Sequence, residues 1–133
     1  MGRRRQAREF ALQALYLVDT GSMPVEDAFG IVGPRYSMDE KTRDFAQGLA
    51  RGTTEHLGEL DKRIQAVAEN WELKRMACVD RNLLRMASYE LLFCPETPVS
   101  VVIDEALEIA KTYSAEDSHK FINGILDKIK PEK

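Results

Sequence analysis

The chain has 133 residues, of which 44% are hydrophobic and 31% are charged. This composition predicts one ordinary globular domain with its own core and excludes an intrinsically disordered chain. No apolar run approaches the roughly 20 residues that span a bilayer, and the basic N-terminus lacks the apolar region of a signal peptide. The two cysteines, Cys78 and Cys94, have no CxxC spacing, so we expect reduced thiols in a cytoplasmic protein.

The formal charge of −3 is distributed unevenly. Residues 1–8 hold four arginines and no acid, and the rest of the chain holds 15 Lys and Arg against 22 Asp and Glu, a charge of −7. A helix N-terminus carries partial positive charge, so each exposed cation there should cost about 0.3–1 kcal/mol. The cluster therefore favours an anionic partner, nucleic acid first, over a role in stability. The alternative is a frayed, solvated N-terminus.

The first half of the chain has helical periodicity. Apolar residues recur at three- and four-residue steps from Ala7 to Val18, and Thr20-Gly21 is expected to end this helix. Pro24 should open a short helix that ends before Gly33-Pro34. Ser37 and Glu40 have the spacing of a capping box, and a long apolar stripe follows over residues 45–67. Gly48 and Gly52 lie one turn apart on that stripe and predict a close helix crossing.

The second half continues the pattern, with helices predicted over residues 77–93, 99–113 and, after a cap of Ser114 and Asp117, up to Ile129. The segment 94–98 separates the first two because it contains two prolines. Residues 69–76, around Trp71, are not assigned. Short connections and the absence of a long period-two segment predict an all-α fold of six or seven helices in a single domain, residues 1–133.

The residues do not suggest catalysis. His56 and His119 are far apart in sequence, and His56 falls on an apolar stripe, which favours a core position. Both cysteines are interpreted as small buried hydrophobes. The acids Asp104, Glu105 and Glu108 are expected to form a solvated helix face. No phosphate-binding loop or metal-ligand spacing is present, so we expect no catalytic residue, no metal and no cofactor.

Three segments carry a family resemblance: RRRQAREFALQALY over residues 3–16, VDRNLLRMASYELL over 79–92, and PVSVVIDEALEIAKTYSAEDSHKFINGILDK over 98–128. In order and position they resemble the NusB family of bacterial transcription antitermination factors. Residues 22–75 carry little of this signature. The resemblance implies two small helical bundles packed together and no enzymatic activity. It also implies binding of single-stranded boxA RNA with NusE, a ribosomal protein, to help RNA polymerase and other Nus factors read through terminators in rRNA operons.

The resemblance assigns RNA contacts to two distant segments, which are expected to form one site. The RNA-binding residues carried over are Arg3, Arg4, Arg5, Arg8, Asp117, Lys120 and Phe121. Phe121 lies four residues before Ile125, so a core position is the alternative for its ring. Because a carboxylate repels phosphate, the Asp117→Asn variant is expected to bind RNA more tightly.

The resemblance also implies a surface for NusE, formed by Tyr16, Asp80, Arg81, Tyr89 and Glu90. Among these, Asp80 is expected to be a clean surface contact, whereas the tyrosines lie near apolar stripes. An acidic body suits a basic ribosomal protein. The alternatives are a helical protein–protein scaffold and an RNA-recognition subunit of an rRNA-modifying enzyme, and a homodimer stays open.

Overall fold

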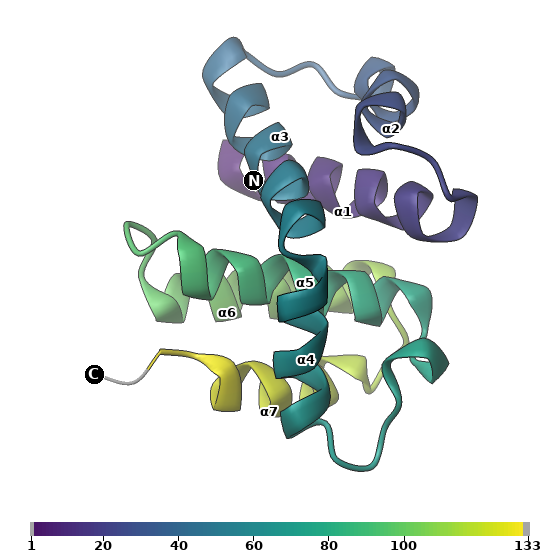
Figure 1. Ribbon diagram of the computed structural model, residues 1–133. Coiled ribbons are helices and arrows are strands. Elements are labelled where there is room, and N and C mark those ends of the chain that lie inside the picture. The colour runs from purple at the N-terminus through teal and green to yellow at the C-terminus, as the bar shows by residue number, and fades with distance from the viewer. Residues whose placement is uncertain (1, 132–133) are drawn as a thin grey trace.

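The computed structural model describes residues 2–131, and these form seven α-helices and two short 3-10 turns (Figure 1). The helices are α1 (Arg3–Gly21), α2 (Val25–Val32), α3 (Glu40–Glu55), α4 (Leu57–Val67), α5 (Cys78–Phe93), α6 (Val99–Tyr113) and α7 (Ser118–Ile129). The turns are η1 (Gly33–Arg35) and η2 (Leu73–Arg75). The all-α fold is confirmed. No helix of the described part is long and apolar enough to cross a membrane.

The helices form two bundles that meet along α1 and α5. Figure 1 shows α1, α2 and α3 in the upper part and α4 to α7 in the lower part, with α5 packed against α1 and α3. The stripe predicted over residues 45–67 is divided between the bundles, because His56 leaves helical geometry with φ −111° and ψ 21°. Its ring is half-buried and stacks on Phe93 with the ring centroids 4.2 Å apart.

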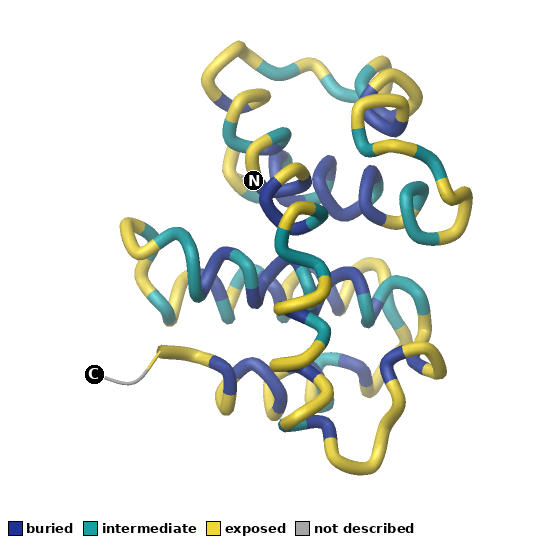
Figure 2. The backbone as a smooth tube through the Cα atoms, in the orientation of Figure 1, coloured by how far each residue is buried: buried dark blue, intermediate teal, exposed yellow. Residues whose placement is uncertain are grey.

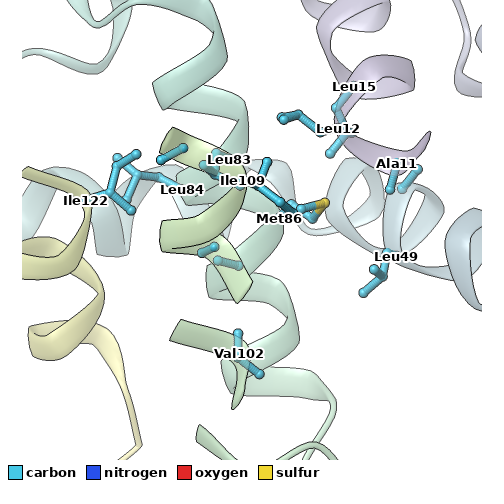
Figure 3. Close-up of a cluster of buried hydrophobic side chains, with 14 of the residues drawn as sticks. Ala11, Leu12, Leu15, Leu49, Leu83, Leu84, Met86, Val102, Ile109 and Ile122 are labelled. Carbon is cyan, nitrogen blue, oxygen red and sulfur yellow. The ribbon is translucent and has the colours of Figure 1, made fainter. Parts of the chain in front are cut away.

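One hydrophobic core serves both bundles. Figure 2 shows buried residues on the middle turns of α1, α5 and α7 and exposed residues on the connections. Figure 3 shows Met86 of α5 reaching toward Ala11 and Leu12 of α1, so that α5 joins the two halves. Burying a side chain of this size stabilises by about 1.5–3 kcal/mol, and the shared core therefore holds the bundles together as one body.

Both predicted caps were wrong. The N-cap of α3 is Asp39, whose Oδ1 accepts a hydrogen bond from the Thr42 N–H at 2.8 Å, and not Ser37. The Ser114 hydroxyl donates to Asp80 instead of capping α7, and Asp117 at the α7 N-cap makes no side-chain cap bond. Ser and Asp near a helix start all resemble caps, and tertiary partners decide among them.

The predicted close crossing exists at only one of the two glycines. A Cβ at Gly52 would overlap the ring of Tyr89 on α5, so this position requires glycine. A Cβ at Gly48 would meet nothing within 4 Å. Gly52 thus sets how closely α3 approaches α5, and Gly48 does not.

Candidate nucleic-acid interface

The first two arginines of α1 are exposed at the end of the helix. The Arg3 side chain is 81% exposed and lies 3.2 Å from the Asp39 carboxylate. The Arg4 guanidinium carbon lies 3.8 Å from the centroid of the Phe45 ring, which holds the guanidinium against α3 by a cation–π contact. These two cations can reach a phosphate without breaking a buried contact.

Arg5 and Arg8 point inward. Arg5 forms a two-pronged ion pair with Glu105 of α6, at 2.5 Å from Nε and 2.8 Å from Nη2. The hydrogen bond from Arg5 holds the pKa of the Glu105 carboxyl below its ordinary value. Arg8 makes the same fork to Glu90 of α5, at 2.9 and 2.6 Å, and the two side chains are 4% and 1% exposed. The predicted RNA contact of Arg8 does not fit this buried position.

The neighbours of α1 resolve the apparent conflict with the helix dipole. The first turn of α1 has no acid, but Asp39 of α3, Glu90 of α5 and Glu105 of α6 converge on it. Glu105, expected to lie on a solvated face, is therefore part of this group. Carboxylates from other helices supply the negative charge that the local sequence lacks.

The second predicted segment lies at the start of α7. Lys120 and Asp117 are exposed, and Phe121 is half-buried against the core. The Phe121 ring also contacts Trp71 edge-on, with centroids 5.5 Å apart. Phe121 therefore lies between core and surface, since its side chain packs against the core and its ring also contacts the exposed Trp71.

The two segments lie at opposite ends of α5. Arg8 pairs with Glu90 near the C-terminal end of that helix, and Ser118 of α7 donates to Asp80 near its N-terminal end. Ten residues of helix separate these anchors, about 15 Å at a rise of ~1.5 Å per residue. The structure does not bring the arginines and Lys120 into one pocket, so a ligand that touches both must be extended.

The residues assigned to a protein partner divide into exposed and buried ones. Tyr16 is 41% exposed and lines an apolar hollow of about 430 Å³ between α1, α2 and the end of α6. Tyr89 is half-buried, with its ring centroid 5.2 Å from that of Phe93. Tyr16 presents the larger contact surface.

Asp80, Arg81 and Glu90 are engaged within the fold. Asp80 is 8% exposed and accepts hydrogen bonds from Ser114 and, at 2.9 Å, from Ser118, so the expectation of a clean surface contact was wrong. The Arg81 side chain is 14% exposed and donates to Asp19 at 2.8 Å. Glu90 is the buried partner of Arg8. Glu90 and Arg81 of α5 therefore fasten α1, and Asp80 fastens α7.

Sequence reasoning missed Trp71 and Phe45. Trp71 lies in the unassigned segment and is 56% exposed, and Phe45 lies on an apolar stripe typical of core. A lone tryptophan in a polar connection is a signal that could have found the first. Phe45 could be recognised only from its contact with Arg4 in the folded protein. Among residues 2–131 no group of three or more His, Cys, Asp or Glu is placed to hold a metal ion.

Fold and surface together define an all-helical, two-bundle binding domain with exposed arginines and aromatic rings. The chain matches the NusB family over residues 5–131. It is 53% identical to transcription antitermination protein NusB of Elusimicrobium minutum, in an alignment covering 100% of this chain and 96% of the relative. The corresponding protein of Pelotomaculum thermopropionicum is 47% identical, with 95% and 88% covered. The chain belongs to the NusB family.

Solved structures agree with this assignment. NusB of T. maritima superposes with a TM-score of 0.87 at 40% identity, covering 95% of this chain and 89% of that one. A chain from a complex of the antitermination factors NusB and NusE with double-stranded RNA superposes with a TM-score of 0.88 at 26% identity, covering 96% and 95%. The two-bundle arrangement is thus the one found in these proteins.

Proposed function

We propose that this chain is a cytoplasmic transcription antitermination factor that binds single-stranded boxA RNA together with NusE. The bound complex would join RNA polymerase and other Nus factors to promote read-through in rRNA operons. Family membership supports this function, and so does the likeness to a chain from a complex of NusB and NusE with double-stranded RNA. The proposal assigns no chemical step to the chain.

The observation that carries the RNA proposal is the pair of exposed cations at the start of α1. Arg3 and Arg4 face solvent, and Arg4 is already ordered over Phe45. Guanidinium groups bind phosphate by paired hydrogen bonds and stack on bases, which suits an unpaired strand. Arg5 and Arg8, tied to Glu105 and Glu90, would position the helix rather than bind phosphate.

A second protein is part of the proposal because the body of the chain is acidic. Outside residues 1–8 the formal charge is −7, which repels RNA and attracts a basic ribosomal protein. The hollow beside Tyr16 offers an apolar surface for such a partner, since Ile31 and Tyr113 on its rim are 48% and 40% exposed. NusE would thus supply contacts and positive charge that the chain lacks.

Binding of fluorescently labelled boxA RNA tests the proposal. Anisotropy is measured with the chain alone, with NusE alone and with both, and a scrambled RNA of equal length is the control. We expect the tightest binding with both proteins and weaker binding of the scrambled strand. If the two proteins together bind boxA no better than NusE alone, the chain is a scaffold and not an RNA-binding factor. Transcription in vitro past a terminator then tests read-through.

A further inference from the structure

Trp71 is an exposed aromatic residue that the proposed function does not yet use. It is the single tryptophan of the sequence, and 56% of its surface is exposed. Its ring meets Phe121 edge-on at 5.5 Å with an interplanar angle of 69°. No hydrogen bond within residues 2–131 involves its indole N–H. Tryptophan is enriched at interfaces because its large apolar ring carries an N–H donor, so this ring, with Phe121 beside it, is suited to contact a ligand.

The connection that carries Trp71 is held in place by two side chains. The Gln65 amide donates to the Trp71 carbonyl oxygen at 2.7 Å, and its own oxygen accepts from the Leu73 N–H at 3.0 Å. Arg81 donates to the carbonyl oxygens of Leu73 and Met76, both at 3.2 Å. A residue fixed in this way loses little conformational freedom on binding. Trp71 is therefore presented as a preorganised surface.

Trp71 and Phe121 form a ridge between two hollows. Both rings line a hollow of about 350 Å³ whose charged residues are Arg75, Asp80, Glu116 and Asp117. Both also line a second hollow of about 280 Å³, whose charged residues are Lys120, Lys128 and Glu69. The ridge thus has a mainly acidic side and a mainly basic side, where two exposed lysines outnumber one exposed glutamate.

We propose that Trp71 stacks on an unpaired base of the bound RNA, with the adjoining phosphates over Lys120 and Lys128. Every base offers a π face, so an exposed indole suits a single strand, while lysines neutralise its backbone. The acidic side repels phosphate and directs the strand toward the lysines. The inference rests on the proposed RNA binding and adds a stacking residue near the N-terminal end of α5, whereas Arg8 pairs near its C-terminal end.

Because Trp71 is the only tryptophan, its fluorescence reports on this site alone. The chain is mixed with a NusE variant whose tryptophans, if any, are replaced by phenylalanine, and boxA-like RNA is titrated in. Stacking of a base on the indole should quench the emission in step with binding measured by anisotropy. A lysine or arginine of the partner inserted over Trp71 is the competing occupant, and it would change the emission on addition of NusE without RNA.

Three substitutions separate stacking from simple apolar burial. Trp71→Ala should weaken RNA binding by the complex about 5- to 150-fold, because base–aromatic stacking contributes about 1–3 kcal/mol. Trp71→Phe should retain most of the affinity, and Trp71→Leu, which keeps apolar area but has no π face, should behave like alanine. Urea unfolding of each variant shows whether the fold is preserved.

Four results bear on the inference separately from the proposed function. RNA binding with unchanged emission and an unchanged affinity of Trp71→Ala would overturn the inference and leave the proposed function standing. Equal affinities for the Phe and Leu variants would overturn stacking as well. Loss of NusE affinity instead of RNA affinity in Trp71→Ala would assign the ridge to the partner. A complex that binds no RNA would refute both proposals.

Discussion

The buried ion pair between Arg8 and Glu90 makes the sharpest prediction about the arginine cluster. The two side chains are 4% and 1% exposed and share hydrogen bonds of 2.9 and 2.6 Å. Removing one partner leaves a buried charge without compensation, which costs about 3–5 kcal/mol. A domain is stable by only about 5–15 kcal/mol, so Arg8→Met or Glu90→Leu alone should bring the chain near unfolding.

The variant that replaces both Arg8 and Glu90 shows whether the loss of stability comes from an unpaired buried charge. Replacing the pair by Arg8→Met with Glu90→Leu removes both charges and should recover most of the lost stability, since apolar replacements of buried pairs are often neutral. In urea, the single variants should shift the midpoint down by roughly 2 M at about 2 kcal/mol per M. The double variant should unfold close to the wild type.

RNA binding by the same proteins separates structure from recognition. The double variant should keep the wild-type RNA affinity of the complex, whereas Arg4→Gln should weaken binding without changing the urea midpoint. The reasoning is refuted if Arg8→Met is as stable as the wild type and loses RNA affinity. That result would mean that Arg8 leaves Glu90 to bind phosphate.

Three further predictions concern packing, pH and local charge. Gly52→Ala should destabilise the fold by about 1–3 kcal/mol because the added Cβ meets the Tyr89 ring. Gly48→Ala should be neutral or stabilise the fold by up to about 1 kcal/mol. Equal urea midpoints for the two variants would contradict this packing. Burial raises the pKa of Asp19, but hydrogen bonds from Asn82 and Arg81 of α5 outweigh burial and hold the pKa below the ordinary 3.8. The contribution of Asp19 to the free energy of unfolding is therefore present above pH 3.8 and is lost as the pH falls through the folded pKa. Asp19→Asn should therefore cost about 1.5–3 kcal/mol at pH 7, and a cost that persists in acid would count against the assignment. Asp117→Asn breaks no side-chain cap and removes a carboxylate that repels phosphate. It should tighten RNA binding by up to about fivefold if a phosphate lies about 4 Å from the side chain. A loss of RNA affinity with the fold intact would contradict this repulsion.

Helices were predictable from the sequence because each buries one periodic face. The apolar stripe from Ala7 to Val18 predicted α1, and the two prolines within 94–98 predicted where α5 ends and α6 begins, each to within a few residues. The division at His56 was not predictable. The apolar stripe continues through this residue, and its imidazole stacks on the Phe93 ring, 37 residues away in sequence.

The candidate site was predictable only in part, because charge alone does not reveal a partner. Arg3 and Arg8 belong to the same cluster, yet one is exposed and the other meets Glu90, 82 residues later in the chain. Asp80 was expected at the surface because a charged residue on an amphipathic helix usually lies there. The hydroxyls of Ser114 and Ser118 make its burial tolerable.

The salt dependence of RNA affinity tests the central claim most directly. For single strands, each phosphate contact contributes about −0.7 to the slope of log affinity against log salt. Replacing Arg3, Arg4 and Lys120 together by glutamine in the complex with NusE should therefore flatten the slope by about 2, while the paired replacement of Arg8 and Glu90 should leave it unchanged. An unchanged slope in the triple variant would contradict the claim that these exposed cations hold the RNA.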